Sequence, residues 1–141
     1  MCSSDLFTDP YTFTHVIHGV VLYGLMWLIG GKWMSPGAML VWGVALESGW
    51  EVLENTDFII NRYREATISL EYYGDSILNS IGDILAMIVG FVLVSRLPGR
   101  VAAVGALALD AALLFLIHDS LLVNIIMLVY PIEAIRRWQL P

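Results

Sequence analysis

Histidine and glutamate side chains recur at helical spacing inside apolar segments of this sequence. His15 and His18 are three residues apart, and Glu47, Glu51 and Glu54 fall within about 60° of one another on a helix. Histidine nitrogen together with carboxylate oxygen suits zinc, manganese or a similar divalent ion. The spacing therefore predicts a metal site that could assist hydrolysis or group transfer.

A second polar series follows in the next apolar segment, where Asp75, Asn79 and Asp83 step by four along one helical face. Asp110 and His118 lie eight residues apart, on one side of a further helix. A carboxylate at mid-membrane costs about 2.5–3.5 kcal/mol even on the lenient insertion scale, so these groups are not expected to face lipid. We expect one converging polar cluster, with His15, Glu54, Asp75 and His118 at its rim and Glu47, Asp83 and Asp110 deepest.

Roles for these residues follow from their chemistry and expected depth. The predicted metal ligands are His15, His18, Glu51, Glu54 and Asp75. The predicted catalytic carboxylates are Glu51 and Asp83, of which the deeper can orient water. Arg62 and Arg64 are expected to hold an anionic head group, such as a lipid-linked phosphate, with Asn79 beside the substrate. A hydrogen bond between helices is the alternative for Asn79.

The composition indicates a bilayer as the solvent of this chain. Of its 141 residues 58% are hydrophobic and 14% are charged, against roughly a quarter charged in an ordinary soluble domain. The mean hydropathy is +0.75. The net charge of −6 excludes a nucleic-acid-binding role, and the single cysteine, Cys2, excludes an internal disulfide.

Four segments are long and apolar enough to cross a hydrocarbon core of roughly 30 Å. They are expected at about residues 13–31, 36–54, 76–94 and 101–117. A shorter run at 121–130 is expected to form a re-entrant or interfacial helix. The predicted fold class is therefore an all-α integral membrane bundle of four transmembrane helices plus this short C-terminal helix, in a single domain spanning residues 1–141.

Two other segments have the pattern of helices that lie in the membrane interface. Residues 57–71 place Ile59, Tyr63, Ala66 and Leu70 on one face, and residues 132–139 carry Arg136 and Arg137. Counting cations near the span ends favours a cytoplasmic position for Lys32, Arg96 and Arg100 and an outer position for residues 55–74. The expected location is the bacterial inner membrane, with several crossings.

Several motifs resemble a small bacterial family of multi-pass membrane proteins, the domain-of-unknown-function 2585 family. They are YTFTHVIHG at 11–19, ESGWEVLEN at 47–55, RYREATISLEYYGDSILNSIGDIL at 62–85 and NIIMLVYPIEAIRRWQ at 124–139. The first three helices also resemble VanZ-type membrane proteins, which implies at most a link to envelope or glycopeptide-antibiotic phenotypes. Family members carry an additional N-terminal stretch with paired cysteines, so this chain is expected to be a truncated or shorter variant.

Three functions remain open at this point. The first is a metal-assisted hydrolase or transferase that acts on a lipid or envelope substrate. The second is a proton or ion relay along the carboxylates and histidines, and the third is a non-catalytic packing or partner subunit. Tolerance of Glu51→Gln would indicate the packing role, since glutamine keeps a hydrogen bond but loses the charge.

Overall fold

The computed structural model describes residue 7 and residues 9–139, which form helices joined by short loops. The all-α class is confirmed for these residues. The helices are α1 (Thr12–Gly30), α2 (Pro36–Glu54), α3 (Asp57–Ala66), α4 (Ile77–Val94), α5 (Gly99–Ile117), α6 (Leu121–Val129) and α7 (Glu133–Gln139).

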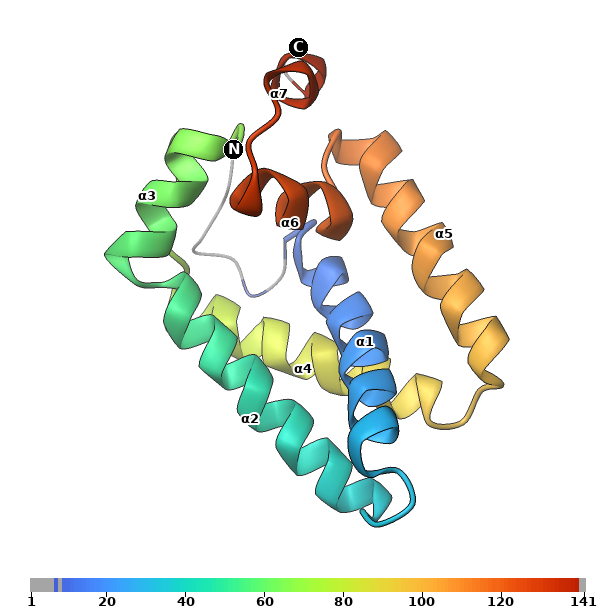
Figure 1. Ribbon diagram of the computed structural model, residues 1–141. Coiled ribbons are helices and arrows are strands. Elements are labelled where there is room, and N and C mark those ends of the chain that lie inside the picture. The colour runs from blue at the N-terminus through green and yellow to red at the C-terminus, as the bar shows by residue number, and fades with distance from the viewer. Residues whose placement is uncertain (1–6, 8, 140–141) are drawn as a thin grey trace.

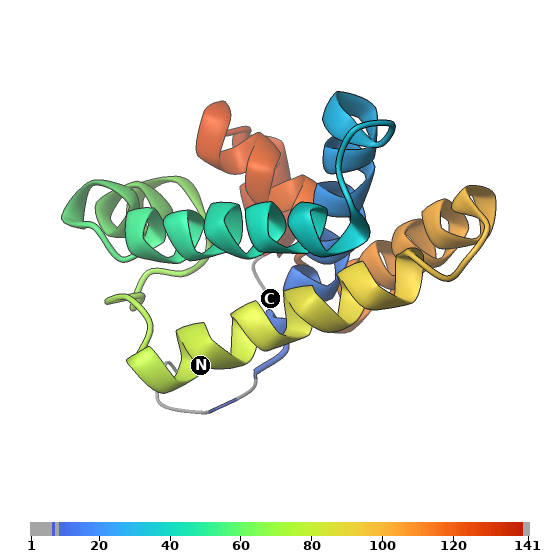
Figure 2. The same cartoon turned by 90° about the horizontal axis from the view of Figure 1, so that it is seen from below.

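The central contact of the bundle is the crossing of α1 and α4, which Figures 1 and 2 show from two directions. Glycines allow the two backbones to touch. A Cβ atom added to Gly19 would lie 2.1 Å from the carbonyl oxygen of Met87, and one added to Gly90 would lie 2.1 Å from that of Val16. Small residues at such crossings are the usual means of close helix packing in membranes.

The apolar core lies beside this crossing. Met26 of α1, Met39 of α2 and Met87 and Phe91 of α4 form one buried cluster. A Cβ atom added to Gly43 of α2 would lie 3.1 Å from the Phe91 ring. This core holds α1, α2 and α4 together.

Local sequence signals explain where two of the long helices begin. Ser35 and Ser76 are extended N-cap residues, and their hydroxyls accept hydrogen bonds from the backbone N–H groups of Ala38 and Asn79. Pro36 occupies the first position of α2, where its missing N–H is no loss. These caps fix the register of the helices that carry the acidic residues.

Helix α3 ends earlier than the predicted interfacial helix at 57–71. Thr67 is extended, with φ −115° and ψ −173°. Its hydroxyl donates to the carbonyl oxygen of Tyr63 at 2.7 Å and accepts from the backbone N–H of Ser69 at 3.1 Å. This side-chain pairing ends the helix at Ala66, and the chain then folds back toward α4.

Three of the described helices, not four, are long and apolar enough to cross a membrane: α1, α4 and α5. The prediction of a fourth span at 36–54 is not met, because the composition of α2 is not apolar enough. Although α2 has 19 residues, Glu47, Glu51 and Glu54 lower its mean hydropathy. The short helix α6 has only nine residues.

The C-terminal part is tied to the rest of the chain through Asp119. Its Oδ2 accepts a hydrogen bond from the Tyr11 hydroxyl at 3.0 Å. Its Oδ1 accepts from the side chain of Gln139 at 3.1 Å and from the backbone N–H of Ser120 at 2.9 Å. One buried carboxyl thus joins the start of α1, the α5–α6 connection and α7.

Candidate functional site

Two histidines of α1 contact one glutamate of α2 at the centre of the candidate site. His15 and His18 are one turn apart and both face α2. His15 Nδ1 lies 2.6 Å from Glu47 Oε1, and His18 Nδ1 lies 2.9 Å from the same oxygen. A carboxylate oxygen is only an acceptor, so an ionised Glu47 fixes both rings as donors from Nδ1.

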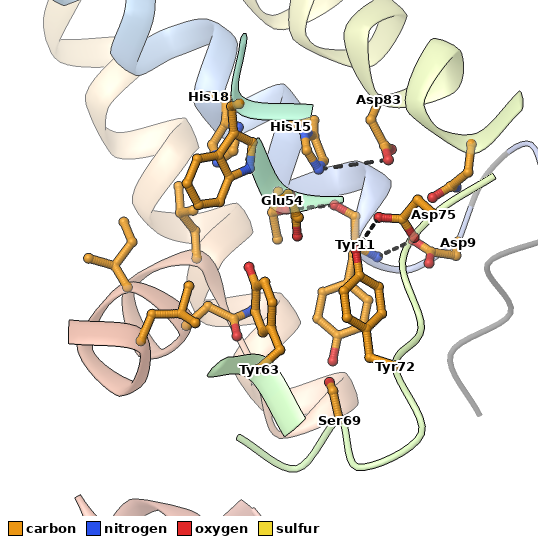
Figure 3. Close-up of a pocket in the computed structure, with 17 residues that line it drawn as sticks. Asp9, Tyr11, His15, His18, Glu54, Tyr63, Ser69, Tyr72, Asp75 and Asp83 are labelled. Atoms are coloured by element: carbon orange, nitrogen blue, oxygen red, sulfur yellow. Dashed lines mark hydrogen bonds and ion pairs between the residues drawn. The ribbon is translucent and has the colours of Figure 1, made fainter. Parts of the chain in front are cut away.

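His15 also approaches acidic residues of α2 and α4. Its Nδ1 lies 3.6 Å from Glu51 Oε1, and its Nε2 lies 3.8 Å from Asp83 Oδ2. Figure 3 shows Asp83 facing the imidazole ring. His15 is therefore surrounded by three carboxyl groups, and all four residues are buried.

These side chains form two overlapping groups that could hold a metal ion. One ligand atom each from His15, His18 and Glu47 lie within 4.8 Å of one another, and the same holds for His15, Glu51 and Asp83. Histidine and carboxylate ligands of this kind suit zinc or manganese.

Some carboxyl oxygens in this cluster have no hydrogen-bond partner. Both oxygens of Glu51 and the Oδ1 of Asp83 are buried and unpartnered. An unpaired buried polar group costs on the order of 1–3 kcal/mol, and a charged one costs more. These oxygens are the feature of the site that most needs a ligand or a proton.

A cavity of about 240 Å³ extends from His15 and His18 toward α3 and α6; we name it the tyrosine pocket. Tyr11, Tyr63 and Tyr72 lie around it below His15 and Glu54 in Figure 3. The rings of Tyr63 and Tyr72 meet edge to face, with centroids 5.4 Å apart. The pocket connects the histidines to the segment between α3 and α4.

Acidic groups line the outer part of the tyrosine pocket. Glu54, at the end of α2, and Asp75, just before α4, both border it. Burial raises the pKa of Asp75, and the hydrogen bond that it accepts from the Tyr72 hydroxyl at 2.6 Å offsets part of that rise. Burial and the neighbouring Glu54 carboxyl raise the pKa of Tyr63 and of Tyr72, so both hydroxyls stay protonated.

The five predicted ligands fall into two sets. His15, His18 and Glu51 belong to the groups around His15, whereas Glu54 and Asp75 lie outside both groups and border the pocket. Glu47, predicted among the deepest acids, instead contacts both histidines. The predicted depths assumed that the helices run parallel. Because α4 crosses α1, residues at the same count along the two helices do not lie at the same depth.

The predicted substrate residues are also separated. Asn79 is buried and lines the tyrosine pocket, as do the predicted catalytic residue Asp83 and the histidines. Arg62 donates from Nε to the carbonyl oxygen of Leu128 at 2.9 Å, which satisfies the end of α6. Arg64 lies 4.8 Å above the ring of Tyr73. Neither arginine lines the pocket.

Sequence reasoning missed the aromatic lining. The pattern at 57–71 places Tyr63 on one face of an interfacial helix and predicts no role for Tyr11 or Trp50. The available signal was the position of these residues, since each lies within four residues of a predicted site residue.

This chain is similar to proteins of a family of unknown function. Residues 1–141 match the family described as "Protein of unknown function (DUF2585)", which confirms the resemblance predicted from the motifs. A UPF0314 protein of Paracoccus denitrificans (strain Pd 1222) is 49% identical over 137 residues, which cover 97% of this chain and 70% of that protein. A UPF0314 protein of Rhizobium meliloti (strain 1021) is 47% identical, with 97% and 69% covered. No solved structure matches the chain.

Proposed function

The chain belongs to the DUF2585 family of proteins of unknown function, and from its own site we propose that it is a metal-dependent hydrolase or transferase of the bacterial inner membrane. The proposed substrate is a lipid or another envelope molecule. The single observation that carries the proposal is the set of unpartnered, buried carboxyl oxygens of Glu51 and Asp83 beside His15.

Membrane insertion is supported by an inside-out distribution of residues. The buried set is rich in charged and polar groups, whereas many large apolar side chains are exposed. Helix α2 follows the same rule, since Glu47 and Glu51 are buried while Val41, Trp42 and Val52 face outward. Hydropathy averaged along a helix does not record which side chains are buried and which face outward. We therefore propose α2 as the fourth membrane-crossing helix.

The position of a metal ion follows from the hydrogen bonds of His15. Donation from Nδ1–H to Glu47 leaves the Nε2 lone pair on the side of Asp83. A carboxylate that fixes the tautomer of a ligating histidine in this way is common around protein metal ions. We assign His15, Glu51 and Asp83 as the ligands, and Glu47 as the residue that orients His15.

The chemistry that such an ion supplies is activation of water or polarisation of an ester oxygen. The protein residues would orient the reactants. His18 lies where the tyrosine pocket meets the candidate metal ligands around His15, and Glu47 holds its ring. Burial of the cluster excludes bulk water, which strengthens each electrostatic contact.

The two alternatives have less support from the geometry. A packing role is best served by acids with complete hydrogen bonds, yet neither oxygen of Glu51 has a hydrogen-bond partner of normal geometry, with the Ser80 hydroxyl and Asp83 its polar neighbours on α4. A relay needs a continuation from Asp110, but Asp110 accepts a hydrogen bond from the backbone N–H of Leu122 at 3.4 Å, at the start of α6. A cation beside His15 would give these oxygens the partner that a packing role leaves missing.

Metal analysis of the protein purified in detergent tests the proposal. After incubation with Zn²⁺ or Mn²⁺ and removal of free ion, we expect about one ion per chain. His15→Ala, Glu51→Gln and Asp83→Asn should lower this content, while Glu65→Gln, on the exposed face of α3, should not. Wild-type protein that retains no metal under these conditions would contradict the proposed function.

Activity is tested on the same samples. Bacterial lipid extract is incubated with metal-loaded protein, and the lipids are compared by mass spectrometry before and after. Wild type should consume one lipid class, and Glu51→Gln and Asp83→Asn should not. Consumption at equal rates by all three proteins would contradict the assigned ligands.

A further inference from the structure

We propose that the substrate of this site is a lipid whose head group carries an ammonium group, with its hydrocarbon chain seated between α1, α2 and α5. The inference rests on the proposed function and deepens it by naming the class of lipid. Two cavities support the inference, one apolar and the other lined by acidic and aromatic residues. They meet beside the candidate metal ligands around His15.

The first cavity is a groove of about 640 Å³ between α1, α2, α5 and α6; we name it the lateral groove. Its exposed walls are mostly hydrocarbon, with Val21 on α1, Leu46 on α2, and Ala106 and Leu107 on α5. His18, Glu47 and Asp110 also border it. Two of the helices that wall this groove, α1 and α5, are long and apolar enough to cross a membrane.

The occupant of the lateral groove follows from its surroundings. In a bilayer, a groove walled by α1 and α5 lies at the depth of the lipid chains, where water is scarce. A hydrocarbon chain is the apolar molecule that the bilayer itself supplies at that depth. Such a chain makes dispersion contacts with the apolar walls and has no polar group of its own that needs a partner.

The second cavity is the tyrosine pocket, and it joins the groove. His18, Trp50, Leu121 and Ile125 line both cavities. A molecule that occupies both must be polar at one end and apolar at the other. Its middle, where head group and chain are linked, would lie beside His18 and therefore next to the His15–Glu47 pair.

The charge of the tyrosine pocket selects the head group. Four carboxyl residues line it, and no lysine or arginine among residues 9–139 does. They are Asp9, Glu54, Asp75 and Asp83. Where these carboxyl groups are ionised they repel an anionic head group, and in either protonation state their oxygens accept hydrogen bonds from an ammonium group. Arg62, which could have held an anion, is bonded to the end of α6.

Aromatic rings complete the recognition of a cation. Tyr11, Tyr63, Tyr72 and Trp50 contribute four rings to the pocket wall. A cation over such a ring gains about 0.5–2 kcal/mol, most where water is excluded. Carboxylates together with several aromatic faces suit an ammonium group better than a sugar or a phosphate.

Lipid binding to the purified protein tests the inference. The protein in detergent with EDTA is titrated with phosphatidylethanolamine or phosphatidylglycerol of identical chains, and bound lipid is counted by native mass spectrometry. We expect wild type to prefer phosphatidylethanolamine by about tenfold, the factor that 1.4 kcal/mol is worth. Glu54→Gln combined with Asp75→Asn should bring the two affinities within about twofold.

The chain site is tested with a matched pair of variants on α5. Ala106→Trp fills the lateral groove and should abolish binding of both lipids, while Val104→Trp, at an exposed position of the same helix, should not. Leu46→Trp, on the opposite wall, is a second blocking variant. Helix content and the unfolding temperature establish that each variant is folded.

The outcomes separate this inference from the proposed function. Equal or stronger binding of phosphatidylglycerol by wild type would overturn the ammonium head group, and unchanged binding by folded Ala106→Trp and Leu46→Trp would overturn the groove. Both are measured without metal. Failure of the metal-content experiment therefore leaves the lipid result interpretable, and the reverse also holds.

Discussion

The Nδ1 atom of His15 lies 2.6 Å from Glu47 Oε1, and this contact joins α1 to α2 at the centre of the bundle. It is a buried pair, so its orientation is protected from water. Because Glu47 holds one side of the ring, the other side is free to face Asp83. The contact between α1 and α2 and the proposed metal site therefore both depend on the side chain of His15.

Binding of a divalent ion should stabilise the fold. At a free metal concentration 100 times the dissociation constant, the gain in unfolding free energy is about 2.7 kcal/mol. We expect Zn²⁺ or Mn²⁺ to raise the unfolding temperature of wild type in detergent. Glu51→Gln and Asp83→Asn should abolish this rise, and an equal rise in both variants would contradict their role as ligands.

Gly19→Ala should destabilise the protein by about 1–3 kcal/mol or more, because overpacking forces the backbones of α1 and α4 apart. The added Cβ atom would lie 2.1 Å from the carbonyl oxygen of Met87. Gly24→Ala is the matched control on the same helix, since its Cβ atom would meet nothing within 4 Å. Thermal unfolding of both variants in detergent measures the difference. Equal stabilities would show that α1 and α4 can move apart without loss of stability.

Arg62→Ala should loosen α6 without affecting metal content. It removes a charged donor from the carbonyl oxygen of Leu128, a contact worth about 1.5–3 kcal/mol. Arg64→Ala removes only a ring contact with the exposed Tyr73 and should have a smaller effect. Hydrogen exchange of α6 amides reports the loosening. If Arg62→Ala loses lipid binding while hydrogen exchange of the α6 amides is unchanged, Arg62 would instead have a role in substrate binding.

Asp119→Asn should change how stability depends on pH. Burial raises the pKa of Asp119 above its usual value, although Ser120, Tyr11 and Gln139 donate to it. The folded state thus binds the proton more tightly than the unfolded state does. Its contribution to stability is complete below the unfolded pKa and is lost as pH rises through the folded pKa. Unfolding temperatures from acid to neutral pH should fall less in Asp119→Asn than in wild type, and parallel curves would contradict the raised pKa.

The all-α fold and the convergence of acids and histidines could be predicted from the sequence, because both depend on local spacing. Apolar runs of helical length fix where helices form. The cost of a carboxylate in hydrocarbon requires that Glu47, Glu51 and Asp83 turn inward, whatever the arrangement of the helices. Motif identity over most of the chain likewise required no coordinates.

The tertiary structure alone decided which of those groups meet. Gly19 and Gly90 let α4 cross α1, so Asp83 reaches His15 while Asp75 and Glu54 are left at the tyrosine pocket. Arg62 is directed to α6 by carbonyl groups that no sequence pattern places near it. Spacing along a helix determines the face on which a side chain lies, but the angle between two helices determines the partner that it meets, and that angle is set by packing.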